Sequence, residues 1–207
     1  MKNILCIVNP VSGLKKSLKV FNEVKNKLKS SNTDLELFVS KYPNHIKDYS
    51  SKINKDEFDK IIIFGGDGTI NEVVNGLSSS SNLDSFKLGI IPTGSGNSVA
   101  HDIGSLKLDV AVKKCLGEKV TKMDVNQVNF DSFTRLSVSI LGWGMFSFGN
   151  IRAEKLRFLG PMRYDVASIV TLLEKKIHKA EIIVDGVKKT LECAFIVGCN
   201  SIHSGKG

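Results

Sequence analysis

An aspartate stands among glycines where an apolar run ends and a helical pattern begins, in the stretch FGGDGTINEVVNGL at 64–77. Backbone N–H groups of such a turn, next to a helix N-terminus, can bind phosphate. A carboxylate repels phosphate, so Asp67 fits there if it binds Mg²⁺ or accepts a proton from an attacking hydroxyl. The alternative is that Asp67 only caps the helix starting near Thr69, but capping alone does not explain the flanking glycines.

Two further turns have a similar composition, NPVSG at 9–13 and PTGSGN at 92–97, and each also follows an apolar run. Their glycines can adopt positive φ and expose backbone N–H groups, and their hydroxyl side chains add donors. In a doubly wound parallel sheet, the turns that follow strands lie at the carboxyl edge, where ligands bind. The sequence therefore predicts a phosphate site that includes Ser12, Gly65, Gly66, Gly68, Thr69, Thr93, Gly94, Ser95 and Gly96.

Asn71 and Glu72 come one helical turn after Asp67 and could complete a polar or metal-linked cluster with it, whereas a solvated helix face is the alternative for both. The histidines and cysteines do not indicate a metal centre. The four histidines are scattered along the sequence. The four cysteines match no zinc or C-x-x-C spacing, so we interpret them as reduced core residues of a cytosolic protein.

The elements that must position these turns alternate along residues 1–120, as they do in layered α/β domains. Short apolar runs predict strands at 3–8, 34–40, 60–64 and 86–91. Apolar residues at helical spacing predict helices at 14–28, 44–53, 70–77 and 107–116. We expect these residues to form an α/β nucleotide-binding catalytic domain.

Residues 121–207 have a different pattern, which predicts a second, β-rich domain. KMDVNQVNF and FTRLSVSILGWG resemble two strands joined by the turn DS, and AEIIVDGVKKTLECAFIVGCN resembles a hairpin across DG. A helix is expected from Tyr164 to His178. The sequence ends directly after a strand, so we expect this mostly antiparallel β-sandwich domain to be incomplete.

Composition and charge limit the class of protein. The 207 residues are 42% hydrophobic, enough for real cores, and carry a formal net charge of +8, which favours an anionic partner. No nucleic acid is expected, because no aromatic residues are interleaved with the lysines as in a nucleic-acid platform. The first ten residues lack a signal peptide's long apolar region, and no apolar stretch reaches the roughly 18 residues of a membrane span.

The motifs together carry a family resemblance. GGDGTINEVVNGL followed by LGIIPTGSGN, with NPVSG after the first strand, resembles the catalytic domain of diacylglycerol and sphingosine kinases. LSVSILGWGMF and EKLRFLGPMRYD (154–165) resemble the lipid-pocket segment of the sphingosine and ceramide kinase branch. The final GCNSIHSGKG resembles the strand and loop before the family's last β segment. This resemblance implies a phosphofructokinase-like α/β domain and transfer of the γ-phosphate of ATP, with Mg²⁺, to diacylglycerol, ceramide or a sphingoid base. NAD kinases share the G-G-D-G-T turn, so an NAD kinase-like enzyme is an alternative.

The resemblance also implies roles for individual residues. Asp67 matches the general base, and the glycine turns match the phosphate-binding loops. Arg157 and Arg163 match basic residues that approach the transferred phosphate, with a surface salt-bridge pair as the alternative. The remaining positions match nucleotide contacts, namely Asn9, Pro10, Val11, Ser40 and Glu72.

Two features depart from the family pattern. Sphingosine kinases usually carry an aspartate that meets the sphingoid head group just before the segment matching IRAEKLR, and this sequence has Asn150. An amide bonds hydroxyls but cannot balance an ammonium, which leaves diacylglycerol or ceramide open. The family's acidic D-G motif, expected after the G-K-G-like loop, is missing, so a non-catalytic nucleotide-binding fragment is a further alternative.

The expected location is the cytoplasm, with peripheral association to an anionic membrane surface that holds the lipid substrate. Two segments supply basic side chains for such contacts, 14–29 and 152–179. Each basic residue near an anionic surface can contribute about 1 kcal/mol. The segment 152–179 is favoured because it also borders the expected lipid pocket, whereas 14–29 is expected to be a solvated helix face.

Overall fold

The computed structural model describes residues 2–29, 33–79, 83–156, 162–174 and 176–203. The chain divides into two compact units, Met1–Ser139 with Asn200–Gly207, and Ile140–Cys199. The sequence pattern placed a domain boundary near residue 120, before the strands at 126–137 that the first unit contains. A functional boundary at 120 stays a prediction.

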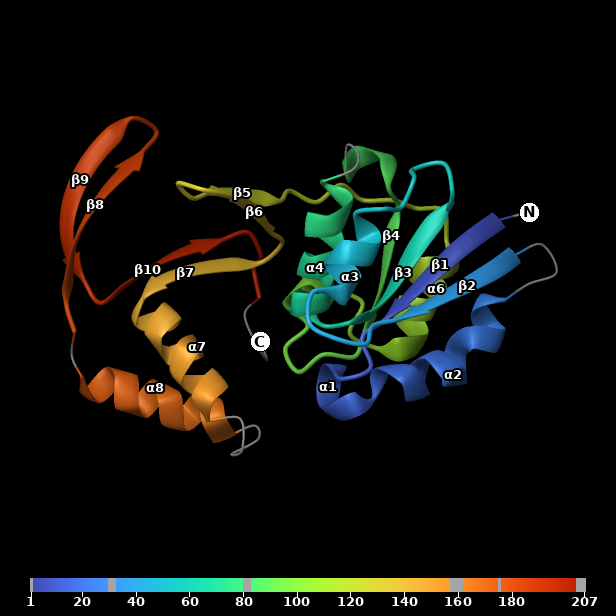
Figure 1. The fold of residues 1–207 in the computed structure, drawn as a ribbon, viewed down its shortest axis with the longest axis horizontal. Helices are drawn as coiled ribbons and strands as arrows, with labels where there is room; N and C mark the ends of the chain where they lie inside the picture. Colours follow the sequence, from blue (N-terminus) through green and yellow to red (C-terminus); the bar gives the residue numbers. More distant parts are fainter. Residues whose placement is uncertain (1, 30–32, 80–82, 157–161, 175, 204–207) are drawn as a thin grey trace. The chain divides into compact units, whose positions relative to one another are not determined.

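The first unit contains a four-stranded parallel sheet in the order β2-β1-β3-β4 (Figure 1). Its strands are β1 (Lys2–Val8), β2 (Thr33–Val39), β3 (Lys60–Gly65) and β4 (Leu88–Pro92). All three strand pairs are parallel and in continuous register, from Lys2↔Thr33 to Gly65↔Pro92. The parallel α/β class predicted from the alternating pattern is therefore confirmed.

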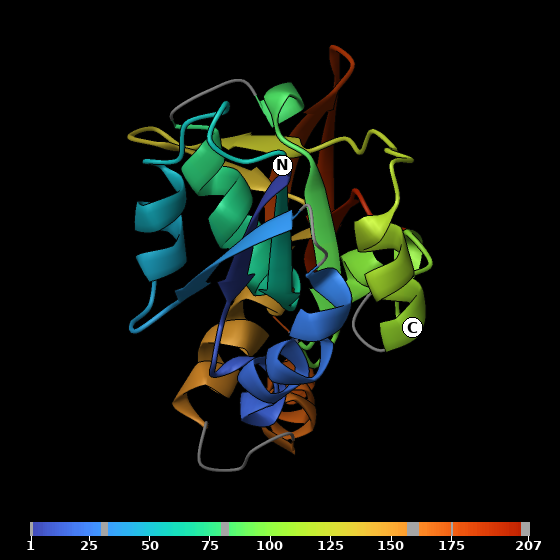
Figure 2. The same ribbon diagram turned by 90° about the vertical axis from the view of Figure 1, so that its right-hand side faces the viewer.

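Both faces of the sheet are buried under helices, which explains why β1 and β3 are continuous apolar runs. Leu5 and Ile7 pack on one face with α3 (His45–Ser50), α4 (Asp67–Leu77) and α5 (Ser98–Asp102). Cys6 and Val8 pack on the other with α2 (Ser17–Leu28) and α6 (Leu108–Leu116). Figure 2 shows α3 and α4 on one side of the sheet and α6 on the other.

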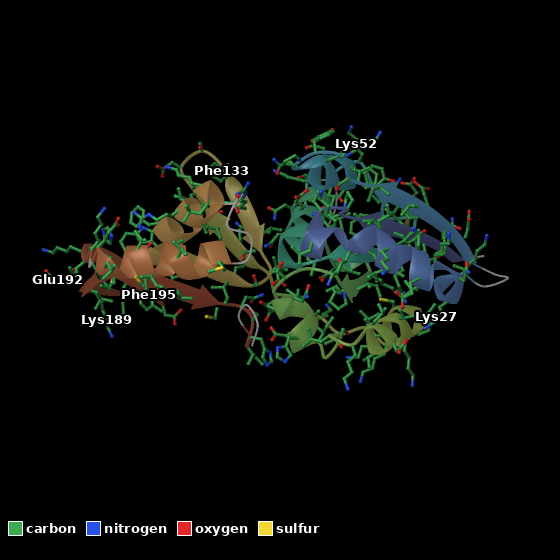
Figure 3. All side chains as sticks on the ribbon, turned by 90° about the horizontal axis from the view of Figure 1, so that it is seen from below. Lys27, Lys52, Phe133, Lys189, Glu192 and Phe195 are labelled. Carbon is green, nitrogen blue, oxygen red and sulfur yellow. The ribbon has the colours of Figure 1, made fainter. Side chains whose placement is uncertain are left out.

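α2 and α6 share one face of the sheet and are also joined at their surfaces. The Lys27 Nζ on α2 donates to the Asp109 Oδ1 on α6 at 3.2 Å, and Lys27 is labelled in Figure 3. Both side chains are well exposed, so this ion pair adds little stability by itself. The apolar contacts beneath it hold the layer together.

The helix predicted from residue 14 begins later than expected. α2 starts at Ser17, and the preceding short segment α1 (Ser12–Lys15) contains left-handed backbone at Gly13, Leu14 and Lys15. The physical cause is a close backbone approach, because a Cβ on Gly13 would lie 1.6 Å from the carbonyl oxygen of Thr93. Leu14, expected on the apolar face, is consequently 74% exposed.

The remaining strands of the first unit form an antiparallel hairpin. β5 (Asn126–Asn129) pairs with β6 (Thr134–Ser137), close to the two strands predicted around the turn DS. A short 3₁₀ turn at Leu83–Ser85 precedes β4. After β6 the chain enters the second unit at Ile140 and returns to the first at Asn200.

The second unit combines antiparallel strand pairs with two helices. Its elements are β7 (Ile140–Gly144), α7 (Met145–Lys155), α8 (Arg163–Leu173), β8 (His178–Val184), β9 (Val187–Cys193) and β10 (Phe195–Cys199). β10 pairs with β7, and β8 with β9 through a left-handed Asp185-Gly186 turn, as the DG signal predicted. The antiparallel character is confirmed, but α8 ends at Leu173 rather than at His178, and α7 was not predicted.

In the described ranges, no helix combines the length and apolar character that crossing a bilayer requires.

Candidate active site

The three glycine turns lie side by side because their strands end in register. Val8 at the end of β1 pairs with Phe64 of β3, and Gly65 pairs with Pro92 of β4. Hydrogen bonds continue this pairing into the turns, since the Asn9 N–H donates to the Phe64 carbonyl and the Thr93 N–H to the Gly65 carbonyl. The predicted meeting of segments 9–13, 65–69 and 92–97 at one sheet edge therefore holds in the structure.

The β2 end joins the same edge. The Ser40 N–H donates to the Val8 carbonyl at 3.0 Å, one residue beyond the paired strands. Ser40 is half-buried there, next to the first turn. Its predicted nucleotide contact stays a prediction.

The glycines of the second and third turns do not have left-handed backbone, and Gly66 and Gly94 serve close packing instead. Among the described glycines, positive φ occurs at Gly13, Gly104, Gly144 and Gly186 and not in the turns 65–69 and 92–97. The expectation of positive φ was therefore wrong for those two turns. A Cβ on Gly66 would lie 2.9 Å from the Gly94 Cα, and one on Gly94 would lie 2.4 Å from the Gly66 Cα. The two turns touch backbone to backbone, and any side chain would separate them.

Asp67 is the first residue of α4, but its carboxylate binds the start of a different helix. Oδ2 accepts a hydrogen bond from the Ser98 N–H at 2.9 Å, and Oδ1 accepts one from the Val99 N–H at 3.0 Å. These two residues begin α5. The carboxylate thus ties the second glycine turn to the third, and each oxygen retains a further lone pair for a ligand or a proton.

Asn97 is the N-cap residue of α5, yet its side chain serves the turn before it. Its Oδ1 accepts from the Gly94 N–H at 2.9 Å, and its Nδ2 donates to the Gly94 carbonyl at 2.8 Å. Asn97 has a φ of 62°, a conformation that asparagine tolerates better than most residues. Sequence reasoning missed this residue, although an asparagine closing a glycine turn is a recognisable signal for it.

The first turn is tied to the second through Asn9. Its Nδ2 donates to the Thr69 Oγ1 at 3.1 Å, and its Oδ1 accepts from the Val11 N–H at 3.3 Å. Pro10 and Val11 lie in this turn with Val11 exposed, and the Ser12 N–H bonds the Asn9 carbonyl. Of the predicted residues in the first turn, Asn9 is therefore the one that links the loops.

A buried pair of hydroxyl groups joins the third turn to the start of α2. The Ser17 Oγ and the Thr93 Oγ1 lie 2.7 Å apart, and both residues are buried. Thr93 was a predicted donor for a ligand, whereas its hydroxyl already has a partner here. Ser17 was not predicted, because it stands inside a helical pattern without any local signal.

Gly68 and Ser95 have open surroundings at this edge. Gly68 is exposed, and no atom lies within 4 Å of the position that a Cβ would take. Ser95 is exposed at the tip of the third turn, with Gly96 half-buried behind it. A ligand can therefore approach the backbone at the N-terminus of α4.

Glu72 and Asn71 lie on α4 but turn to other partners than Asp67. The Glu72 carboxylate accepts hydrogen bonds from the N–H groups of Ile46 and Lys47 at the start of α3. Burial raises the pKa of Glu72, and those two bonds only partly offset it. The Asn71 Oδ1 accepts from the Val138 N–H at 3.0 Å. Both side chains thus hold neighbouring elements in place, and the nucleotide contact expected for Glu72 stays a prediction.

The described residues do not build a metal centre on their own. Within the described ranges, no group of three or more His, Cys, Asp or Glu is placed to hold a metal ion. Both Asp67 oxygens already accept backbone hydrogen bonds. We therefore assign none of these residues to Mg²⁺ and derive no step through it.

Three predicted substrate residues belong to other parts of the chain. Asn150 belongs to α7 of the second unit and Arg163 begins α8, and the side chains of both lie outside the described parts of the chain. Arg157 lies wholly outside the described residues. Their predicted contacts with substrate and phosphate stay predictions.

Known proteins share this sequence pattern and this fold. Residues 3–128 match the family model for the diacylglycerol kinase catalytic domain. Sphingosine kinase 1 of Arabidopsis thaliana is 29% identical over 83% of the chain and 37% of its own length. Human ceramide kinase is 28% identical over 87% of the chain and 37% of its own length. The chain thus spans little more than a third of these relatives.

A solved structure has the same fold over nearly the whole chain. The crystal structure of a diacylglycerol kinase from Bacillus anthracis superposes with a TM-score of 0.71 and 25% identity. The superposition covers 98% of this chain and 65% of the Bacillus anthracis chain. With the family match over more than half of the residues and three linked turns at the sheet edge, the chain belongs to the family of the diacylglycerol kinase catalytic domain, a family of lipid kinases.

Proposed function

We propose that this chain carries the catalytic site of an ATP-dependent lipid kinase, which transfers the γ-phosphate of ATP to a lipid hydroxyl. The observation that carries the proposal is the position of Asp67, whose carboxylate lies where the second and third glycine turns meet. A carboxylate held rigidly beside open backbone suits a reaction in which positioning supplies most of the catalysis.

In the proposed step, the lipid hydroxyl oxygen forms a bond to the γ-phosphorus while the bond from that phosphorus to the β–γ bridging oxygen breaks. The hydroxyl proton passes to a free lone pair of the Asp67 carboxylate, and ADP leaves. A positioned general base of this kind typically contributes 10²–10⁴-fold to the rate.

The nucleotide phosphates would bind at the N-terminus of α4. The helix has eleven residues, and Gly68 in its first turn leaves the backbone accessible. The N-terminus of α5, by contrast, is already bound by Asp67 and is a poorer place for a second anion. We assign Gly66, Gly68 and the Asn9–Thr69 pair to the phosphates, and Ser40, Val11 and Ser95 to the rim of the nucleotide site.

For the acceptor we propose a lipid with a neutral head group, diacylglycerol or ceramide, in preference to a sphingoid base. The support is Asn150, an amide that cannot balance an ammonium. Asn150→Asp should then shift the ratio of turnover toward sphingosine. A wild-type protein that already prefers sphingosine would contradict this preference.

Transfer from γ-labelled ATP to an acceptor panel tests the function. Diacylglycerol, ceramide and sphingosine in mixed micelles are compared with NAD⁺ under the same conditions. Label in a lipid is the expected result. Label in NAD⁺ alone would support the NAD kinase alternative, and nucleotide binding without any transfer would support a non-catalytic module.

We also propose that the protein acts at the cytoplasmic surface of an anionic membrane, since its substrate is a membrane lipid. Lys176 and Lys179 are exposed basic residues of the second unit, and Lys176 shares the Glu174 carboxylate with Arg152 at a longer distance of 3.7 Å. Vesicle co-sedimentation should require phosphatidylserine, weaken with salt and decrease when both lysines become Gln. Binding that ignores salt and both substitutions would contradict an electrostatic contact.

A further inference from the structure

Two asparagines of α4 bind the backbone of β6 and of the residue that follows it, as a neighbouring strand would. The Asn75 Oδ1 accepts from the Leu136 N–H and its Nδ2 donates to the Leu136 carbonyl, both at 2.9 Å. The Asn71 Oδ1 accepts from the Val138 N–H at 3.0 Å. The other edge of β6 pairs with β5, so both edges of this strand are bound.

The spacing explains why two asparagines four apart can do this. Four helical residues advance about 6 Å, and two strand residues advance about 6.6 Å. Asn75 therefore meets Leu136 in β6, and Asn71 meets Val138, two residues further along and just past the end of that strand. This match fixes the position of β6 along α4, because a slip by one strand residue would break all three bonds.

The segment that returns from the second unit is bound in a comparable way by α5. The Asp102 carboxylate at the end of α5 accepts from the N–H groups of Ile202 and His203, each at 3.1 Å. The same carboxylate bonds the His203 Nδ1, and the His203 ring stacks on His101. One carboxylate thus holds the returning chain by two backbone bonds and one side-chain bond.

The outgoing and returning segments are also joined to each other. The chain leaves the first unit after Ser139 and returns at Asn200, and the Asn200 N–H donates to the Ser139 carbonyl at 2.9 Å. The Asn200 Nδ2 also donates to the Asp124 carbonyl at 2.7 Å. Both connections to residues 140–199 are therefore fixed within the first unit.

The helices that hold these connections are the same two that Asp67 ties together. Asp67 begins α4, and its carboxylate binds the first two residues of α5. Asn71 and Asn75 lie one and two turns further along α4, and Asp102 ends α5. A continuous set of hydrogen bonds therefore runs from each connection to the Asp67 carboxylate.

We propose that Asn71, Asn75 and Asp102 are positioning residues that set where residues 140–199 leave and rejoin the first unit with respect to Asp67. Their kinetic effect rests on the proposed lipid kinase function, since residues 140–199 would carry most of the lipid contacts. Their mechanical coupling to Asp67 does not depend on that function and can be measured separately.

Amide hydrogen exchange of the 207-residue chain tests the coupling. Asn75→Ala and Asp102→Asn are compared with the matched surface variants Asn26→Ala on α2 and Asp109→Asn on α6. Asn75→Ala should speed exchange at Leu136, and Asp102→Asn at Ile202 and His203, by roughly fivefold to tenfold for the lost bonds. The coupling predicts that exchange at Ser98 and Val99 also rises in both variants and not in the controls.

Asn75→Asp keeps the acceptor for the Leu136 N–H but loses the donor, so an intermediate increase in exchange at Leu136 is expected. This variant keeps the test decisive if Asn75→Ala does not fold. Faster exchange at Leu136, or at Ile202 and His203, with unchanged exchange at Ser98 and Val99 would overturn the coupling. In the acceptor assay, the variants should raise KM for the lipid severalfold and leave KM for ATP nearly unchanged. Equal changes in both KM values would overturn the positioning role, whereas no transfer by the wild type would count against the kinase function alone.

Discussion

Asp67 at the start of α4 accepts a hydrogen bond from the backbone N–H of Ser98 at the start of α5, at 2.9 Å. The N-termini of two helices therefore share one carboxylate, because Asp67 is the first residue of α4 and its side chain is hydrogen-bonded to the first residues of α5. The arrangement neutralises part of the carboxylate's charge with the α5 dipole, which lessens its repulsion of a phosphate bound nearby. It also means that any substitution of Asp67 changes both the chemistry and the packing of the two turns.

Gly68→Ala should separate nucleotide binding from folding. Gly68 is exposed without left-handed φ, so alanine should raise the unfolding free energy by about 0.5–1 kcal/mol in this helical turn. The added methyl group should weaken ATP binding, because it fills the approach to the α4 N-terminus. Urea unfolding and titration calorimetry measure the two effects.

Gly66→Ala is the matched comparison for that variant. Its Cβ would lie 2.9 Å from the Gly94 Cα, so the two turns must move apart and both stability and ATP affinity should decrease. If ATP affinity is unchanged in Gly68→Ala, the phosphates of ATP do not bind at the α4 N-terminus.

Lys15→Gly should stabilise the fold, whereas Lys16→Gly should destabilise it. Lys15 has a φ of 65°, a left-handed conformation that costs a non-glycine residue about 1–2 kcal/mol, while Lys16 has right-handed helical angles. The expected changes are a gain of about 1 kcal/mol for the first and a loss of about 0.5–1 kcal/mol for the second. Thermal unfolding of the pair measures this directly, and a loss for both would argue against the left-handed turn.

Glu72→Gln tests whether Glu72 serves the fold. Burial raises the pKa of Glu72, so its ionised form is disfavoured in the folded protein. The pKa of Glu72 in the unfolded chain is about 4.3. As the pH rises from that pKa through the raised pKa of the folded protein, the wild type should therefore lose stability relative to Glu72→Gln. Denaturant unfolding from pH 4 to pH 8 measures the difference. A difference that is independent of pH would contradict the burial effect.

Asp102→Asn should show the opposite dependence on pH. Burial alone would raise the pKa of Asp102, but hydrogen bonds from His203 and Ile202 outweigh it and lower the pKa. The stabilisation by this carboxylate should be complete above its unfolded pKa, about 3.9, and disappear as the pH falls through the folded pKa. The wild type should thus exceed Asp102→Asn in unfolding free energy at pH 7, and the gap should close on acidification. A gap that persists at pH 2.5 would show that the loss is not tied to ionisation.

Much of the fold follows from local pattern. Ile61–Phe64 and Ile4–Val8 are apolar on both faces, which distinguishes buried parallel strands, and the sheet edge of three turns follows from topology. The Asp185-Gly186 hairpin follows from turn chemistry. These features depend on neighbours in sequence, so they can be predicted from one chain.

The parts that were missed depend on contacts between distant residues. Nothing local shows that Asp67 binds the start of α5 rather than α4, that Gly13 meets Thr93, or that Asn75 pairs with Leu136. Gly66 and Gly94 looked like residues for positive φ, because sequence cannot distinguish that use from close packing of two backbones. α7 was missed because its apolar residues lack a clear helical face.

Asp67→Asn, compared with a structural control variant, tests whether the Asp67 carboxylate accepts the proton in transfer to a lipid hydroxyl. An amide keeps one acceptor for Ser98 or Val99 but turns an NH₂ group toward the other, so about 1–3 kcal/mol of stability should be lost. Asn97→Gly removes the two bonds to Gly94 without straining the left-handed backbone, and should loosen the same turn while sparing the carboxylate.

The deciding measurement is single-turnover transfer from γ-labelled ATP to diacylglycerol or ceramide in micelles, with ATP affinity measured in parallel at a temperature where all variants stay folded. If the carboxylate is the general base, Asp67→Asn should bind ATP within a few-fold of the wild type and transfer phosphate roughly 10²–10⁴-fold more slowly, while Asn97→Gly should lose far less of the transfer rate. Transfer by Asp67→Asn at a rate equal to that of Asn97→Gly would show instead that Asp67 is not the general base and only joins the starts of two helices.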